Sequence, residues 1–267
     1  MSAATASAPA IDIGSGAGIP LPRLVKIELR KMVDTRAGFW LLASIGIITA
    51  LVMVIQLWVA AAQDLTLNFD SFITSMSSPM GVLLPVLGIL SVTSEWGQRT
   101  GLVTFTLEPR RSRIVSAKLL AGLVVAVAAV VVALALATLG NVLADPITGL
   151  GGDWNLSLGA IFEIFILQAV GLTTGFAFGM LIMNTAAAIV LFFVYSFVLP
   201  GLFAWLAAVA EWFKDLQPWV DFGFAQGPLI THEMNGEAWA QFAVSGAIWL
   251  LLPLALGILR LLRSEVK

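Results

Sequence analysis

Long runs without a charged side chain dominate this sequence, and they limit the folds that it can adopt more than any other feature. Each of four such runs exceeds the roughly 20 apolar residues that a helix needs to cross the hydrocarbon core of a bilayer. They are Ala37–Gln63, Ser71–Ser94, Leu119–Ala144 and Ala238–Leu259, of 27, 24, 26 and 22 residues. Charged residues make up only 11% of the chain and the mean hydropathy is +0.97, so there are too few polar side chains to cover a soluble globule. The sequence therefore predicts an integral membrane protein.

A fifth uncharged run, Ile164–Ala210, has 47 residues, and a straight helix of that length would measure roughly 70 Å, more than twice the bilayer core. The run must turn back, and Asn184-Thr185 is the best place because Asn tolerates turn conformations. Alternating strand patterns are absent, and backbone groups in lipid must be satisfied within the segment, so we expect an all-α bundle of six transmembrane helices. The expected spans are 38–62, 72–94, 116–143, 156–183, 186–206 and 238–260.

Basic residues are distributed unevenly among the segments that connect the spans. Thirteen of the fourteen Lys and Arg residues precede the first span, lie between the second and third, or follow the sixth, and Lys214 alone lies on the other side. Because positively charged connecting segments remain in the cytoplasm, we expect both termini to be cytoplasmic.

The N-terminal region precedes the six-helix domain, which we place at 38–265. Residues 1–20 are rich in Ala, Ser and Gly, and we expect a disordered tail there. In residues 21–37, apolar side chains recur at helical spacing opposite a basic face, which predicts an amphipathic helix on the inner membrane surface. The alternative is a plain extension of the first span, but Gly38 and the density of charge favour a bend.

The connecting segment 95–113 is expected to be cytoplasmic, and its basic residues follow from that orientation. The orientation does not explain Leu102, Val103, Phe105 and Leu107, because apolar side chains exposed in an aqueous loop usually mark a binding site for another protein. We interpret this segment as a docking element. Its periodicity leaves helix and strand open.

The same segment resembles the loop between the second and third spans of ABC-2 type transporter permeases. The chain matches that pattern at six positions, and Thr100-Gly101 inverts the commoner Gly-Thr order. The six matching residues are Glu95, Leu107, Pro109, Ser112, Arg113 and Lys118. The amphipathic helix and the six spans are also similar, so the resemblance covers about residues 20–265.

The resemblance implies a transport subunit in a bacterial plasma membrane, paired with a second permease copy and coupled through this loop to two separate ATPase subunits. ATP and Mg would bind the partner, and this chain would carry no cofactor. The ATPase-coupling residues carried over by position are Glu95, Arg99, Thr100, Leu102, Phe105, Pro109, Arg113 and Lys118, of which the last two would anchor the third helix. Phe105 would act as the apolar anchor. Related permeases carry short re-entrant helices before the last span, which here would be the extracellular segment 207–237; a simple interfacial loop is the alternative.

The spans contain few polar side chains that a substrate could contact. The candidates for a substrate path are Gln56, Glu163, Gln168, Tyr195 and Ser196, although such residues more often bond neighbouring helices. Gly171, Gly175 and Gly179 lie on one face of the fourth span and allow close helix contact, within this chain or with another copy. His232, the single histidine, invites a metal-site or pH-sensor interpretation with Glu233 and Glu237, but we expect a solvated loop residue.

Several function classes find no support in the sequence. It contains no Walker motif, no zinc-ligand spacing and no nucleophile elbow, and we expect no catalytic residues, no metal and no nucleic-acid partner. The scarcity of ionisable residues in the spans argues against an ion-driven carrier. We therefore expect ATP-driven export of an amphipathic or hydrophobic compound, such as a drug or lipid-like molecule. The alternative is a membrane scaffold, or a signalling or assembly protein, that recruits a cytosolic partner without transport.

Overall fold

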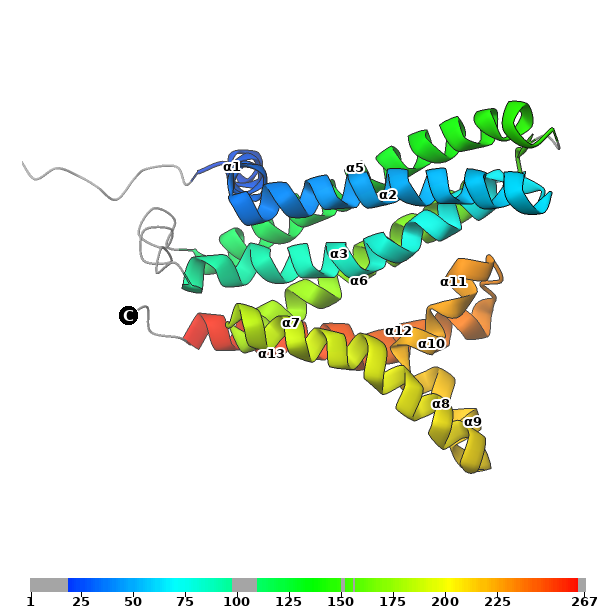
Figure 1. The fold of residues 1–267 in the computed structure, drawn as a ribbon. Coiled ribbons are helices and arrows are strands. Elements are labelled where there is room, and N and C mark those ends of the chain that lie inside the picture. Colours follow the sequence, from blue (N-terminus) through cyan, green and yellow to red (C-terminus); the bar gives the residue numbers. More distant parts are fainter. Residues whose placement is uncertain (1–18, 98–109, 150–151, 156, 264–267) are drawn as a thin grey trace, which may run out of the picture.

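A computed structural model describes residues 19–97, 110–149, 152–155 and 157–263, and these residues form a bundle of helices (Figure 1). Six helical stretches in this part of the chain are long and apolar enough to cross a membrane, which confirms the predicted all-α architecture with six spans. The first four are α2 (Arg36–Gln63), α3 (Phe69–Gly97), α5 (Arg111–Thr148) and α6 (Leu158–Ile182). The fifth joins α7 (Thr185–Phe193), η1 (Val194–Val198) and α8 (Leu199–Val209), and the sixth joins α12 (Gly236–Gly246), η2 (Ala247–Leu251) and α13 (Leu252–Arg263).

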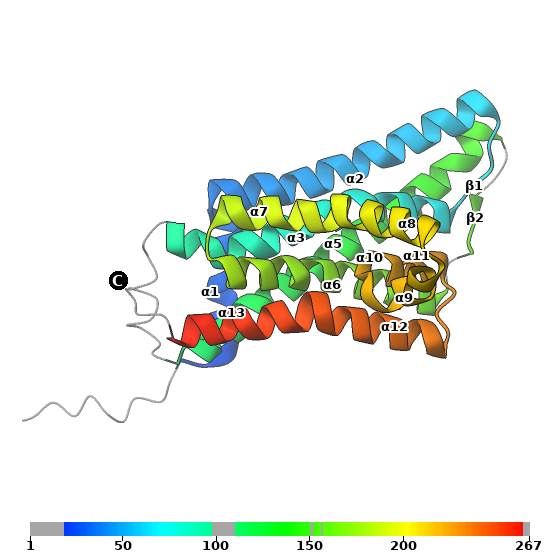
Figure 2. The same cartoon turned by 90° about the horizontal axis from the view of Figure 1, so that it is seen from below.

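The core of the bundle surrounds α3, which packs against α2, α5 and α6. Phe72, Met76, Met80 and Leu84 of this helix are almost completely buried, because they recur at helical spacing along the face toward its neighbours. The fifth and sixth spans both pack on α6. In the view of Figure 2 they flank it, with α7 along one edge of α6 and α13 along the other. Both are less covered than α6, since 11% and 22% of the residues in an 18-residue window of the fifth and sixth spans are buried, compared with 56% in α6.

A seam of small residues brings α3 and α6 into backbone contact. A Cβ atom added at Gly175 of α6 would lie 2.1 Å from the carbonyl oxygen of Pro85, and one added at Gly88 of α3 would lie 2.3 Å from that of Leu172. Only glycine permits so close an approach at these two positions. The glycines Gly171, Gly175 and Gly179 on one face of the fourth span therefore pack against α3 within this chain.

The turn that divides the long apolar run lies at the predicted position. α6 ends where Met183 adopts a left-handed conformation, with φ of 54°. The side-chain oxygen of Asn184 then accepts a hydrogen bond from the backbone N–H of Ala187 and caps the start of α7.

Two wide helical turns, η1 and η2, interrupt the fifth and sixth spans, and each precedes a Leu-Pro pair. Pro200 and Pro253 have no backbone N–H, so they cannot bond the carbonyl groups of Ser196 and Trp249 four residues earlier. A widened turn accommodates the proline ring within an otherwise continuous helix. These two wide turns were not predicted from the sequence.

Short elements complete the fold at the two ends of the bundle. α1 (Leu21–Asp34) lies across one end, and the chain bends at Thr35, whose hydroxyl accepts a hydrogen bond from the backbone N–H of Gly38 (Figure 1). At the opposite end β1 (Leu67–Asn68) pairs in parallel with β2 (Gly152–Asp153). The predicted 207–237 segment forms three short helices, α9 (Glu211–Val220), α10 (Phe222–Ala225) and α11 (Gly227–Thr231).

Candidate functional site: a buried ion-pair network at the basic end

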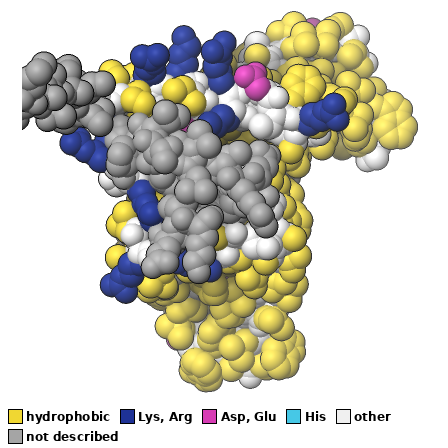
Figure 3. All heavy atoms as spheres, turned by 90° about the vertical axis from the view of Figure 1, so that its left-hand side faces the viewer, with side chains coloured by type: hydrophobic (Ala, Val, Ile, Leu, Met, Phe, Trp, Pro, Cys, Tyr) yellow, Lys and Arg dark blue, Asp and Glu magenta, His cyan; other side chains and the backbone are white. Residues whose placement is uncertain are grey.

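The end of the bundle that α1 crosses carries most of the described basic side chains (Figure 3). They come from α1, from the start of α5 and from the end of α13. Lys214, on α9, lies at the other end of the molecule. The uneven charge distribution in the sequence therefore corresponds to one end of the folded bundle.

Two carboxylates and two ammonium groups of the described residues form an ion-pair network beneath this basic surface. Lys118 Nζ on α5 lies 2.7 Å from Glu28 Oε2 on α1 and 3.0 Å from Glu95 Oε1 on α3. Lys31 Nζ on α1 lies 2.7 Å from Glu28 Oε1 and 2.7 Å from the same oxygen of Glu95. Each carboxylate therefore contacts both cations, and the network joins three helices.

Burial makes this network different from an ordinary surface ion pair. Glu28, Glu95 and Lys118 are 6%, 8% and 5% exposed, and Lys118 also donates a hydrogen bond to the carbonyl oxygen of Ser91. Charges withdrawn from water are stable only when they are paired and hydrogen-bonded, and each of these two buried carboxylates contacts two ammonium groups among the described residues.

Lys31 is the more exposed cation of the network and remains protonated there. Its partial burial lowers the pKa of the ammonium group, but hydrogen bonds to Glu28 and Glu95, and the charges of these carboxylates, outweigh this effect. The net result is a pKa above the ordinary value of 10.5. The ammonium group of Lys31 therefore stays positively charged at neutral pH.

The structure brings together two of the residues assigned to ATPase coupling, Glu95 and Lys118, which flank the segment 98–109 on either side. Arg113, in the first turn of α5, donates a hydrogen bond from Nη2 to the carbonyl oxygen of Ile19 at the start of α1. The other five assigned residues, Arg99, Thr100, Leu102, Phe105 and Pro109, lie outside the described residues.

Sequence reasoning missed two members of the network, Glu28 and Lys31. Lys31 was expected on the solvated face of the amphipathic helix, whereas its ammonium group reaches α3. Glu28 lies four residues after Leu24 and four before Met32, and all three are the buried residues of α1. A carboxylate within an apolar helical stripe was the available signal, because such a group needs a cationic partner when the stripe is buried.

Two further arginines tie the sixth span to this end of the bundle. Arg111 Nη1 donates to the carbonyl oxygen of Leu261 at 2.6 Å, linking the start of α5 to α13. Arg260 Nη1 donates to the carbonyl oxygen of Leu181 at 2.5 Å, linking α13 to the end of α6. Four of the six spans thus connect to one another close to the ion-pair network.

Among the predicted substrate-path residues, the two glutamines bond neighbouring helices. Gln56 Nε2 donates to the carbonyl oxygen of Ser71 at 3.0 Å and to Ser75 Oγ at 2.9 Å, joining α2 to α3. Gln168 Nε2 donates to the carbonyl oxygen of Ser77 at 3.3 Å, joining α6 to α3. These contacts favour a structural role for both side chains.

Glu163 pairs with His232, and the expectation that this histidine is a solvated loop residue is wrong. His232 Nδ1 lies 2.7 Å from Glu163 Oε2, and Nε2 lies 3.0 Å from Asp70 Oδ1. The left-handed conformation of His232, with φ of 58°, ends α11 where this helix packs on α6. No group of three metal-ligating side chains suited to a metal ion occurs among the described residues.

The two carboxylates also change the protonation of His232. Partial burial lowers the pKa of the imidazole. The hydrogen bonds to Glu163 and Asp70, together with the negative charges of both carboxylates, raise it by more, so the pKa lies above the ordinary value of 6.5. His232 therefore bridges Asp70 of α3 and Glu163 of α6 at the end of the bundle opposite to the basic surface.

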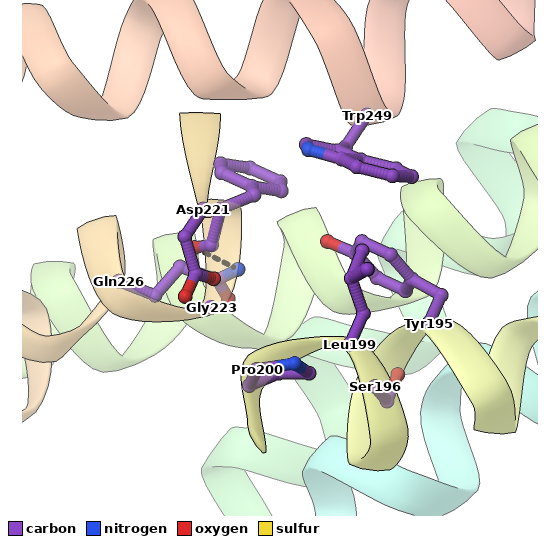
Figure 4. Close-up of a pocket in the computed structure, with 9 residues that line it drawn as sticks. Tyr195, Ser196, Leu199, Pro200, Asp221, Gly223, Gln226 and Trp249 are labelled. Carbon is purple, nitrogen blue, oxygen red and sulfur yellow. Dashed lines mark hydrogen bonds between the residues drawn. The ribbon is translucent and has the colours of Figure 1, made fainter. Parts of the chain in front are cut away.

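Tyr195 and Ser196 lie together beside a cavity of about 170 Å³ (Figure 4). Its walls come from η1 and α8, from the chain around α10, and from η2. The lining residues are Tyr195, Ser196, Leu199, Pro200, Asp221, Phe222, Gly223, Gln226 and Trp249. Of the five substrate-path candidates, these two alone line this cavity.

No protein-family model matches the sequence, and no curated protein matches it significantly. The functional interpretation therefore depends on the residues and contacts described above and on the resemblance in the segment between α3 and α5.

Proposed function

We propose that this chain is the membrane-spanning subunit of an ABC-2 type transporter in a bacterial plasma membrane. In this proposal it works as a dimer, homo- or heteromeric, with two separate ATPase subunits that bind ATP and Mg. The chain itself catalyses no reaction. Its cargo is an amphipathic or hydrophobic compound, which suits spans with few ionisable side chains.

The observation that carries the proposal is the contact between Glu95 and Lys118 within the ion-pair network. These residues lie on either side of the segment with the apolar side chains of Leu102 and Phe105, and they are bonded to each other and to α1. A force applied to this segment would therefore reach α3, α5 and α1 together. A coupling loop needs such a stiff attachment, because a flexible one would absorb the movement of the ATPase.

The proposed orientation places the basic end of the bundle in the cytoplasm, following the positive-inside rule. α1 would then lie at the inner membrane surface, with Arg23, Lys26 and Arg30 near anionic lipid headgroups. The segment between α3 and α5 would face the ATPase subunits.

The experiment that tests the proposal is purification of the tagged protein from its native membranes in mild detergent, followed by mass spectrometry. We expect a second permease copy and an ATPase that contains a Walker sequence. Phe105→Asp should remove the ATPase while the protein still inserts and purifies, because an anchor residue of this kind contributes about 2 kcal/mol or more to binding.

Thr104→Asp provides the control, since it adds the same charge one residue away and keeps the aromatic side chain. ATPase recovery that is unchanged by Phe105→Asp would contradict the docking role of this segment. A partner that lacks a nucleotide site would instead support the alternative, a membrane scaffold that recruits a cytosolic protein.

A further inference from the structure

The cavity between the fifth and sixth spans combines a buried carboxylate with aromatic walls, and we propose that it binds a small organic cation of the alkylammonium class. This inference concerns a binding site in the chain itself. The site does not require the ATPase, so binding to it can be tested separately from the proposed transport function.

Asp221 supplies the negative charge of the cavity. The residue is only 3% exposed, and its carboxylate accepts hydrogen bonds from the backbone N–H of Phe224 and from Gln217 Nε2, both at 3.1 Å. Both donors are neutral, and no described Lys, Arg or His forms an ion pair with this carboxylate. The hydrogen bond from Phe224 caps the start of α10. It does not supply a positive charge to balance the buried carboxylate of Asp221. A bound cation would balance it.

The walls beside Asp221 are the rings of Tyr195 and Trp249. Their centroids are 5.1 Å apart with an angle of 37° between the ring planes. Trp249 Nε1 donates to the carbonyl oxygen of Val220 at 2.7 Å, which fixes the indole in place. Aromatic faces attract cations through the ring quadrupole, and the attraction is stronger where the contact is shielded from water.

Polar oxygen atoms around the cavity also favour a cation over an anion. The Tyr195 hydroxyl points into the cavity, and it forms no hydrogen bond with any residue that the structure describes (Figure 4). The carbonyl groups of Ser196 and Trp249 have no α-helical donor, because the residues four positions later, Pro200 and Pro253, have no backbone N–H. Both Ser196 and Trp249 line the cavity.

The size of the cavity limits the ligand to a compact group. A dry protein cavity of about 150 Å³ accommodates benzene, so the 170 Å³ available here suits a headgroup of comparable volume. Tetramethylammonium and choline have that size and carry a fixed positive charge. The same chemistry occurs in a free amine and in the headgroup of a lipid.

The test measures binding to the purified wild-type chain in nanodiscs of phosphatidylglycerol, without any ATPase, by titration calorimetry with choline and with tetramethylammonium. We expect saturable binding of both. 3,3-Dimethyl-1-butanol, the neutral carbon isostere of choline, should bind at least about tenfold more weakly, because it lacks the charge that Asp221 and the aromatic rings recognise.

Two variants locate the site. Asp221→Asn preserves the size of the side chain and an oxygen for the helix cap, and it should weaken choline binding at least about tenfold. Asp215→Asn is the matched control, because Asp215 is an exposed carboxylate on the adjacent α9 and should leave binding unchanged. Tyr195→Phe, which keeps the ring, should retain most of the affinity.

Nanodiscs that contain phosphatidylcholine distinguish the two sources of the cation. Weaker apparent binding of free choline in these discs than in phosphatidylglycerol alone identifies a lipid headgroup as the competing ligand, whereas equal binding identifies a soluble amine. The proposal is overturned if the folded wild-type chain shows no saturable choline binding, or if the neutral isostere binds equally well. The isostere comparison decides the question even if Asp221→Asn does not fold.

Discussion

Lys118 on α5 and Glu28 on α1 are separated by 90 positions in the sequence, yet their charged atoms lie 2.7 Å apart in the interior of the protein. The contact connects the helix that crosses the end of the bundle with the longest span. Together with Glu95 and Lys31 it forms one electrostatic unit, so a substitution at one member affects the others.

Replacement of Lys118 by Met should lower the melting temperature of the purified protein in detergent. Removal of Lys118 takes one cationic partner away from each of two buried carboxylates, Glu28 and Glu95, and such a loss costs about 3 kcal/mol or more. Lys26→Met on the exposed side of α1 is the control and should change the melting temperature little. Equal melting temperatures for both variants would show that the network contributes no stability.

Gly175 and Gly171 should differ in their tolerance of alanine. At Gly175 a methyl group would meet the backbone of Pro85 at 2.1 Å, so α3 and α6 must separate, whereas at Gly171 the nearest atom is a Pro85 side-chain carbon at 3.6 Å. We expect Gly175→Ala to destabilise the protein by about 2 kcal/mol and Gly171→Ala to be nearly neutral. Thermal unfolding of the two variants in the same detergent measures this difference.

The contact of His232 with Glu163 and Asp70 predicts a pH-dependent stability. Its pKa in the folded protein lies above the ordinary 6.5, so this stabilisation is fully present below pH 6.5 and is lost as the pH rises through the folded-state pKa. The difference in melting temperature between the wild type and His232→Gln should therefore be largest at low pH and decrease toward alkaline pH. Glu233→Gln, an exposed neighbour, should show no such trend.

The absence of cysteine from the sequence makes the proposed orientation directly testable. A single cysteine replaces Ser112 at the basic end or Gly236 at the opposite end, both of which are exposed. In spheroplasts, a membrane-impermeant maleimide should label the Gly236→Cys protein and should label the Ser112→Cys protein only after lysis. The reverse pattern would place the segment between α3 and α5 outside the cell and contradict ATPase coupling.

The arrangement of spans was predictable from the sequence because hydrophobic length and turn chemistry are local properties. The uncharged runs locate the spans, and Asn184 marks the reversal inside the longest run because its side chain caps the following helix. The proximity of Glu95 to Lys118 was suggested only by the resemblance, which assigned both residues to one coupling element.

The remaining site features depend on tertiary packing that no local pattern specifies. His232 meets Glu163 and Asp70 across separations of 69 and 162 residues, so its environment could not be read from the loop around it. The cavity beside Asp221 also requires three distant segments. Local signals did exist for two features, namely Glu28 within an apolar stripe and the Leu-Pro pairs that follow η1 and η2.

The spans differ in how far other helices of the chain bury them, and this difference implies two rates of sequence change over evolutionary time. Residues of the fifth span that contact only lipid tails can exchange among Leu, Val, Ile and Phe with little effect, since a fluid neighbour adapts to any apolar shape. Gly88 and Gly175 face a backbone that cannot move away, so we expect homologous chains to retain them even where most of the fifth span has diverged.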